Sequence, residues 1–533
     1  MSLTAEQTKI IQAYIKAANK KERHLSRQEC SALGFNKNKI EYHFGSLTKL
    51  KELAKQEFPD AFVNFADGEL FTPKRYAALV QEIKNHKKFV ITTAVTGCEL
   101  DTKFYNSLQN YCKVNDAMLL ILPSSDPAKK CAGSVHKWYL DPKISKDENC
   151  IVFGDISLNS NLFISSIKLS AKHIDPITSL GRIGQRNGSF IYASPKQRLK
   201  MVPTSNHKLP HAVMTTGAVT KPNYETNRYM SERTAYIAEH DHVMGAVVVE
   251  VVNDKYYHFR QIQADKKGCF ADLGKFYCGT EVGEMTPEVL VLGDYHSGET
   301  DPSAEKAWGE LIECTKPEIL VFHDIFNGLS ICHHEIHKNI TRARRAAEKK
   351  LDLEQELRRL AWDLNTYSPL VDKIVITKGN HDEFLSRYLE EGRYVQDPQN
   401  HLIGLKLATA MLEGKDPLKF GVELFGLHNP EKFTWLTRDE DFKVARIELG
   451  AHGDLGANGS RGSLRAMENA YGNSVSGHSH SPEILRGAWQ VGTSTLLKLS
   501  YNRGPSSWFH TSCLVYANGS RQLISSIEGK WKL

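Results

Sequence analysis

The first 60 residues carry apolar positions at helical spacing. The spacing recurs in three stretches, namely 8–18, 26–33 and 38–54. Breaks near Gly34 and Gly45 separate short helices. This pattern predicts a small helical domain of the helix-turn-helix type over residues 1–60. Its basic and aromatic residues fit either a DNA-binding module or a helical adaptor with a solvated basic face.

A different pattern begins at residue 88. The runs FVITTAV and AMLLILP have the length and composition of strands, and a helical stretch over residues 101–111 separates them. Two further apolar runs, 243–252 and 256–263, predict a strand pair. The sequence therefore predicts an α/β domain of uncertain role over residues 88–280. Within it, GRIGQRNG (181–188) is interpreted as a glycine-rich loop that could contact phosphates.

From residue 286 to 533, short apolar runs alternate with long helical stretches, which is typical of a layered α/β domain. The whole chain is thus expected to be a multidomain α/β protein with a helical head, an α/β middle region and a layered C-terminal domain. A length of 533 residues agrees with several domains rather than one core.

Composition places the chain among ordinary globular proteins. It has 41% hydrophobic and 24% charged residues, and 68 Lys+Arg against 62 Asp+Glu give a net charge of +6, which neither requires nor opposes a polyanionic partner. The beginning MSLTAEQTKI has no signal-peptide pattern, and the apolar runs are too short to span a bilayer. Ten scattered cysteines without a CxxC pair suggest reduced thiols. We therefore expect a cytoplasmic protein with no membrane partner.

Five apolar runs of the C-terminal region stop at residues that can bind metals. Since the carboxyl ends of parallel strands meet at one edge of a sheet, we expect these residues to converge although they lie far apart in sequence. A lone buried Asp or His at a strand end is usually a capping or hydrogen-bonding group, but a whole series is not explained in that way. The candidate metal ligands are Asp294, His296, Asp324, Asn380, His452, His478 and His480.

The order of these residues, D-x-H, D, G-N-H-D, H and G-H-x-H, resembles the calcineurin-like metallophosphoesterase superfamily over residues 288–500. The resemblance implies a layered metallophosphoesterase sandwich with two metal ions. One ion would be held by Asp294, His296, Asp324 and His480. The second would be held by Asp324, Asn380, His452 and His478, so that Asp324 bridges the two.

The resemblance also implies catalytic roles for two neighbouring residues. His381 matches the family's histidine that faces the scissile phosphate and stabilises or protonates the leaving oxygen, and Asp382 looks like its orienting partner. One departure concerns the residue before Asp324, which is commonly glycine in the family and is His323 here. The expected polar residue downstream is Asn327, so no ligand is lost.

Mixed oxygen and nitrogen ligands without thiolates suit Mn²⁺, Fe²⁺ or Zn²⁺, and Mn²⁺ is the first choice for a nuclease. Two such ions about 3.5–4 Å apart activate a shared water and clamp the phosphate oxygens. Two nearby groups have weaker interpretations. His333, His334 and His337 lack HExxH spacing and are expected to be surface or substrate-contact residues. The arginine-rich stretch from residue 341 fits either a phosphate path or a solvated helix face.

The domain combination is similar to double-strand-break-processing nucleases of this superfamily. It is also similar to pre-early, host-takeover proteins of tailed bacteriophages, in which such a domain is tied to DNA breakdown. These resemblances imply a metal-dependent nuclease that degrades host DNA in an infected bacterial cytoplasm, with DNA as the partner and homo-oligomerisation left open. The alternatives are a phosphatase or nucleotide phosphodiesterase with the same metal core, and a non-catalytic DNA-binding regulator.

Overall fold

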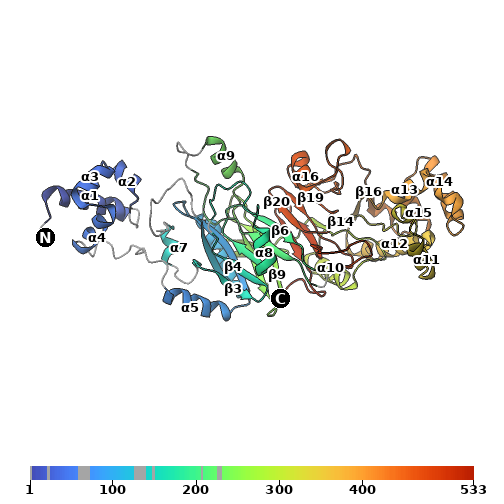
Figure 1. Cartoon of the computed structure of the whole chain (residues 1–533), viewed down its shortest axis with the longest axis horizontal. Helices are drawn as coiled ribbons and strands as arrows, with labels where there is room; N and C mark the ends of the chain where they lie inside the picture. The colour runs from blue at the N-terminus through green and yellow to red at the C-terminus, as the bar shows by residue number, and fades with distance from the viewer. Residues whose placement is uncertain are drawn as a thin grey trace.

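The computed structural model describes residues 3–20, 25–57, 73–124, 140–146, 151–167, 169–205, 208–224 and 231–533. Over these residues the chain is a multidomain α/β protein with a helical head at one end and mixed sheets with helices beyond it (Figure 1). No helix among the described residues is both long and apolar enough to cross a membrane.

The head consists of four short helices, namely α1 (Ala5–Lys20), α2 (Arg27–Ala32), α3 (Lys37–Phe44) and α4 (Leu47–Glu57). Their apolar faces share a small core that includes Ile11, Tyr14 and Phe44. Ser26 caps α2 and forms a reciprocal capping box with Glu29. The predicted break at Gly45 is present, because this glycine ends α3 with a φ of 73°.

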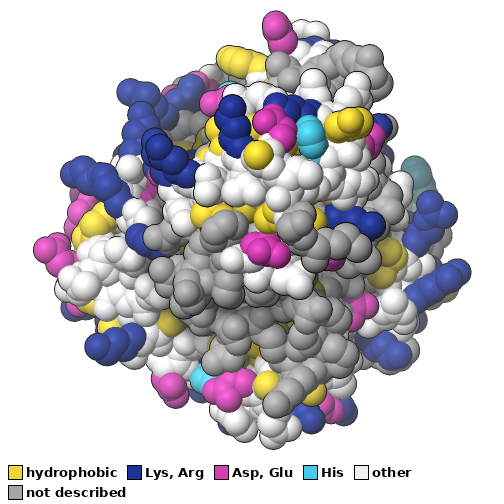
Figure 2. Space-filling view, turned by 90° about the vertical axis from the view of Figure 1, so that its left-hand side faces the viewer, with side chains coloured by type: hydrophobic (Ala, Val, Ile, Leu, Met, Phe, Trp, Pro, Cys, Tyr) yellow, Lys and Arg dark blue, Asp and Glu magenta, His cyan; other side chains and the backbone are white. Residues whose placement is uncertain are grey.

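Two basic residues of α3 are already paired with acids. Lys37 lies 3.8 Å from Glu41 and Lys39 lies 2.9 Å from Glu6. Figure 2 shows this end of the molecule, where Lys and Arg side chains lie mainly toward the edges of the view with acidic side chains among them. The described residues on this face of the molecule therefore do not form a uniformly basic surface.

A four-stranded sheet follows the head, in the order β2-β1-β8-β9. Its strands are β1 (Lys88–Val95), β2 (Met118–Ser124), β8 (Gly245–Val251) and β9 (Tyr257–Gln263). The first two are parallel and are connected by α6 (Thr102–Asn115), as the sequence predicts. The last two form the expected antiparallel pair. Helix α6 buries Phe104, Leu108 and Tyr111 against one face of this sheet.

A ten-stranded sheet crosses the expected boundary at residues 280–286. Strand β6 (Arg198–Val202) of the middle region pairs with β20 (Glu483–Leu485) of the C-terminal region. Its other strands are β3 (Ile156–Asn159), β4 (Leu162–Ser165), β5 (Ser189–Tyr192), β7 (His211–Thr215), β17 (Lys443–Val444), β18 (Ile447–Glu448), β19 (Ser474–Ser476) and β21 (Ala488–Gln490). The middle and C-terminal regions therefore share a sheet.

A six-stranded sheet forms the centre of the C-terminal region, in the order β16-β15-β14-β13-β22-β23. Its strands are β13 (Val289–Val291), β14 (Ile319–His323), β15 (Lys373–Thr377), β16 (Phe433–Trp435), β22 (Thr511–Val515) and β23 (Arg521–Ser525). The first four are parallel, and β22 and β23 are antiparallel to their neighbours.

Successive side chains along a strand of the six-stranded sheet point to opposite faces, so they pack into two different cores. Val289 and Val291 join the core shared with the ten-stranded sheet, whereas Leu290 and Leu292 join the core under the helices. The helices of this region are α10 (Pro302–Thr315), α11 (Asn339–Ala347), α12 (Leu353–Tyr367), α13 (Glu383–Glu390), α14 (His401–Leu412), α15 (Pro417–Leu424) and α16 (Leu464–Tyr471). Most lie beyond β14 and β16 in Figure 1, and together with the sheets they form the expected layers.

Two expectations for the middle region are wrong. The GRIGQRNG segment is not a loop but helix α8 (Gly181–Asn187), and Gly184 in it packs against Val213 and Phe190. The cysteines are not all free thiols. Cys269 and Cys278 form a disulfide beside the paired strands β10 (Phe270–Asp272) and β11 (Lys275–Cys278), which are followed by β12 (Glu281–Glu284).

Candidate metal centre

The parallel strands of the six-stranded sheet bring the predicted residues to one edge. Val291 of β13 is paired with Val321 of β14, which is paired with Val375 of β15, so the three strands end side by side. The segments after them carry Asp294, Asp324 and Asn380. His296 follows β13 as well, whereas the other three histidines come from the facing ten-stranded sheet, where His452 follows β18 and His478 and His480 follow β19.

Four of the predicted ligands have a backbone that is unfavourable for residues with a side chain. The φ angles of His296, Asp324, His478 and His480 are 45°, 45°, 75° and 58°. Left-handed backbone at non-glycine residues costs roughly 1–3 kcal/mol each and concentrates at functional sites. The strain is observed in the structure, and its clustering indicates that these turns serve a site rather than the stability of the fold.

Two glycines allow the carboxylates to reach their positions. A Cβ atom on Gly379 would overlap Oδ1 of Asp324, and one on Gly477 would overlap Oδ1 of Asp294. The residues that follow these glycines are Asn380 and His478, so the backbone carrying each of these ligands passes directly beside a carboxylate. Any larger side chain at either glycine would displace an acid of the centre.

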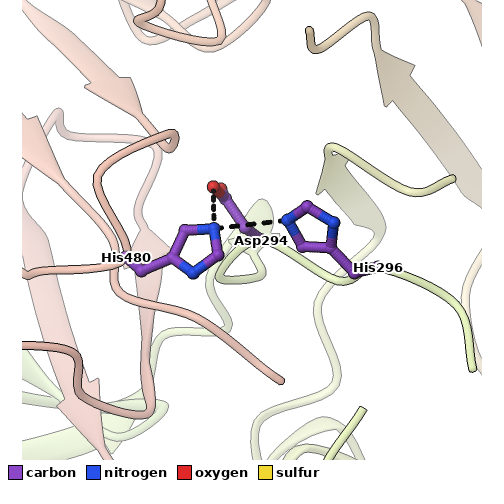
Figure 3. A group of neighbouring side chains, drawn as sticks. All are labelled: Asp294, His296 and His480. Carbon is purple, nitrogen blue, oxygen red and sulfur yellow. Dashed lines mark hydrogen bonds and ion pairs between the residues drawn. The ribbon is translucent and has the colours of Figure 1, made fainter. Parts of the chain in front are cut away.

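Asp294, His296 and His480 form the first group that could hold a metal ion (Figure 3). Nε2 of His480 lies 3.1 Å from Oδ2 of Asp294 and 3.2 Å from Nε2 of His296. Two imidazole nitrogens at this distance share at most one proton between them. A cation close to both nitrogens and the carboxylate satisfies all three lone pairs at once.

Asp324 belongs to two further groups. Its Oδ2 lies 3.7 Å from Nε2 of His296 and 3.4 Å from Nε2 of His452. One group combines Asp324 with His296 and His381, and the other combines it with Asp294 and His452. The Asp324 carboxylate is buried, and it lies close to the imidazole rings of both His296 and His452.

His478 lies close to His452, and Asn380 lies close to His478. Oδ1 of Asn380 is 3.0 Å from Nδ1 of His478, and the His478 ring centroid lies 5.3 Å from that of His452. The backbone amide of His478 donates to both carboxylate oxygens of Asp294, at 3.0 and 2.8 Å. All seven candidate ligands are therefore gathered at one edge of the sheet.

His381 and Asp382 have separate hydrogen-bond partners. Nδ1 of His381 lies 2.9 Å from the Asn327 carbonyl, which can only accept, so Nδ1 donates and Nε2 is the ring nitrogen not used in this hydrogen bond. The carboxylate of Asp382 accepts from the backbone amides of Phe326 and Gly379. Asn327 therefore orients the His381 ring, while Asp382 joins the turns after β14 and β15.

Burial and mutual charge govern the ionisation of this centre. Burial, and then repulsion from Asp324, raise the pKa of Asp382 to about 8. Burial, followed by the charge of His381, holds the pKa of His296 well below its usual value and keeps the ring neutral. Burial opposes charging His452, but attraction to Asp324 and Asp294 outweighs it and raises its pKa to about 9.

The structure adds residues that the sequence pattern did not single out as part of the site. His323 is fully buried, and both of its ring nitrogens lack a hydrogen-bond partner among the described residues. The Trp508 ring centroid lies 4.1 Å from that of His480, and the Tyr501 ring lies next to Trp508. In the sequence, His323 stands out only as a departure from the family's glycine. The two aromatic residues follow no strand-end pattern that could have revealed them.

The two weaker candidates have mixed outcomes. His333 and His334 lie near the centre, with rings 4.8 and 5.9 Å from that of Phe384, which is stacked on His381. His337 is exposed. Arg358 and Arg359 are exposed and paired with Glu354 and Asp363, as in a solvated helix face, whereas Arg345 is buried and paired with Glu335.

Comparisons with known proteins identify one relative. No family model matches the chain, and no solved structure matches it. The chain is 28% identical over 479 residues to Protein A1 of Escherichia phage T5, and the alignment covers 84% of each protein. The similarity thus extends over most of both chains rather than over the C-terminal region alone, and the chain is related to a bacteriophage protein.

Proposed function

We propose that this chain is a two-metal phosphodiester hydrolase that cuts DNA. The observation that carries the proposal is the position of the Asp324 carboxylate, whose Oδ2 lies 3.7 Å from Nε2 of His296 and 3.4 Å from Nε2 of His452, two histidines of different candidate metal groups. A carboxylate placed between two sets of imidazole donors is suited to bridge two cations.

The donor set fits divalent metal ions. Buried polar atoms are normally paired, yet Nε2 of His452 has no hydrogen-bond partner among the described residues, and Nε2 of His296 faces Nε2 of His480 at 3.2 Å, where at most one of the two can carry a proton. Asp294, His296, Asp324 and His480 would hold one ion, and Asp324, Asn380, His452 and His478 the other. When bound, such ions supply hydroxide at neutral pH and neutralise phosphate charge. Oxygen and imidazole donors without thiolates favour Mn²⁺, with Fe²⁺ and Zn²⁺ as alternatives.

The remaining residues act on the substrate. His381 is held through its Nδ1, so its Nε2 is the nitrogen that would act on the substrate. In the imidazolium form, Nε2–H would stabilise the leaving oxygen of the scissile phosphate or give it the proton. Its ring centroid lies 4.4 Å from that of His296, which places it beside the proposed ligands. Asp382 is a positioning residue, because it fixes the turns that carry Asp324 and Asn380.

DNA is the proposed substrate because of the chain's relationships and its additional regions. The sequence resembles break-processing nucleases, and the alignment to a phage protein covers most of the chain. The helical head is a candidate for DNA binding, although Lys37 and Lys39 are paired with acids. Degradation of host DNA in the cytoplasm of an infected bacterium is the proposed biological role.

The decisive experiment incubates the purified full chain with Mn²⁺ and plasmid, linear or single-stranded DNA, and in parallel with an aryl phosphodiester. Metal-dependent loss of intact DNA, abolished by EDTA and by Asp324→Asn, supports the proposal. Turnover of the aryl ester alone would instead indicate a nucleotide phosphodiesterase or phosphatase. No turnover with Mn²⁺, Fe²⁺ or Zn²⁺, together with retained DNA binding, would favour a non-catalytic regulator.

A further inference from the structure

A row of aromatic rings lies beside the candidate metal centre. The Trp508 ring centroid lies 4.1 Å from that of His480, and the Tyr501 ring centroid lies 5.7 Å from that of Trp508. The row continues from Tyr501 to His381 at 6.3 Å, and His381 is stacked on Phe384 at 4.5 Å. We call Trp508, Tyr501, His381 and Phe384 the aromatic wall. It connects a proposed ligand, His480, to the proposed leaving-group residue, His381.

The solvent-facing part of the wall consists of Tyr501 and Trp508. Tyr501 is 50% exposed and Trp508 is partly exposed, whereas Phe384 is 6% exposed. The two outer rings meet at 63° and form a corner, which can take the face of one flat group and the edge of another. Large aromatic side chains are usually buried more completely, so their exposure beside a metal centre indicates a binding role.

The segment that carries these rings is held in place. The backbones of Ser506 and Thr204 exchange two hydrogen bonds, at 2.7 and 3.0 Å. The Asn502 side chain donates to the Leu497 carbonyl at 3.2 Å and bonds to Ser506 at 3.1 Å. A ring on a fixed segment loses little conformational entropy when a ligand stacks on it. The middle region thereby supports the wall through Thr204.

The surroundings of the wall suit a chain of phosphates with bases attached. Lys498 and Arg503 lie exposed on the same segment as Tyr501. Trp508 also borders a cavity of about 330 Å³ whose charged lining consists of Lys208 and two acids, Asp301 and Glu528. This volume is at the lower end of small-ligand sites and is large enough for a single base. Cations interleaved with aromatic rings are typical of surfaces that bind single-stranded nucleic acid.

We propose that Tyr501 and Trp508 stack the base next to the scissile phosphate, so that the enzyme selects single-stranded or locally unpaired DNA. The inference rests on the proposed function and specifies its substrate. In a duplex both faces of a base are covered by its neighbours, so only an unpaired base can lie against the rings. Duplex ends and nicks are cleaved only to the extent that their base pairs open.

The test compares three substrates of equal length with the full chain and Mn²⁺. They are a single strand, the same strand with abasic sites in place of its bases, and a blunt duplex. The wild-type protein is expected to cleave the base-containing strand fastest. Tyr501→Ala should lower the ratio of kcat/KM values for the base-containing and abasic strands about 5- to 150-fold, since stacking on an aromatic side chain has that effect per base.

Two variants control for indirect effects. Tyr501→Phe keeps the ring and should leave the ratio of the two kcat/KM values unchanged. A lower ratio would show that the tyrosine hydroxyl, and not stacking, favours the base-containing strand. Tyr236→Ala removes an exposed tyrosine of α9 (Glu232–His240), outside the wall, and should leave the ratio unchanged. If Tyr501→Ala slows both single strands equally, or the wild type cleaves the abasic strand as fast, the inference is overturned while the nuclease proposal stands. If no substrate is cut with any metal, the proposed function itself fails.

Discussion

Two buried groups of charged residues in this molecule differ in how their charges are satisfied. In the first, the Arg260 guanidinium contacts Glu250 at 3.1 Å and Asp272 at 2.9 Å, and Tyr111 donates to Asp272 at 2.8 Å. We call these four residues the Arg260 cluster. In the candidate metal centre, buried acids face histidines, and several ring nitrogens have no partner among the described residues. The first group is complete by itself, whereas the second requires something more.

This difference distinguishes buried charges that hold the fold together from buried charges that are suited to bind a ligand. Gln522 on β23 donates to Asp272 at 2.9 Å, so the Arg260 cluster joins the four-stranded and six-stranded sheets. Its residues have ordinary backbone geometry, whereas four of the proposed ligands have left-handed φ angles. Backbone strain together with unpaired histidine nitrogens is expected where a ligand supplies the missing interactions. The comparison leads to four predictions about what each group contributes.

The largest effect is expected from Asp324→Asn, which removes the shared charge and keeps the shape. Hydrolysis of DNA should fall at least about 10³-fold, because loss of a preorganised charge at a reacting phosphate costs about 4 kcal/mol or more. His478→Ala should act in the same direction. Initial rates at saturating Mn²⁺ measure the effect, and DNA binding should persist. Asp441→Asn, at an exposed ion pair, is the matched control. Wild-type rates in Asp324→Asn would contradict the assignment.

The Arg260 cluster should affect stability rather than turnover. Asp272→Ala leaves the Arg260 guanidinium buried without its main partner, and such a change costs about 3–5 kcal/mol. Tyr111→Phe removes only one hydrogen bond and should cost about 1 kcal/mol. Urea unfolding followed by intrinsic fluorescence measures both. A loss below about 1 kcal/mol for Asp272→Ala would show that the cluster is not needed to join the sheets.

The comparison also shows what sequence can reveal. The convergence of the proposed ligands could be predicted because each follows an apolar strand and because their order resembles a known superfamily. The Arg260 cluster was not predictable, since its members are ordinary residues of β8, β9, β10 and α6 that meet only through packing. Strand β6 joined β20 across an expected domain boundary for the same reason: pairing between segments about 280 residues apart leaves no local pattern.

Metal binding should distinguish the two groups by a smaller, thermodynamic effect. A ligand that binds only the folded state at 100 times its Kd stabilises it by about 2.7 kcal/mol. Mn²⁺ should therefore raise the thermal midpoint of the wild type and of Tyr111→Phe, but not that of Asp324→Asn. Differential scanning fluorimetry with and without EDTA measures the shift. An equal shift in Asp324→Asn would place the bound metal elsewhere.

The smallest effect concerns acid pH and the Arg260 cluster. Burial by itself would raise the pKa values of Glu250 and Asp272, but the Arg260 charge outweighs it and lowers both. A carboxylate whose pKa is lower in the folded state stabilises the fold above its unfolded pKa. That stabilisation is lost as the pH falls through the folded value, so the loss should begin below about pH 4.5. Each acid contributes at most about 1.4 kcal/mol per pH unit there.

Glu250→Gln removes one of these two titrating acids and keeps its shape. Its unfolding free energy should therefore fall less steeply than that of the wild type between about pH 4.5 and 3, while Arg260 retains Asp272 as its partner. Urea titrations at a series of pH values, with EDTA present so that metal release does not contribute, measure the two slopes. Parallel curves would mean that Glu250 binds protons equally in the folded and unfolded states, and Asp272 alone would then balance the buried arginine.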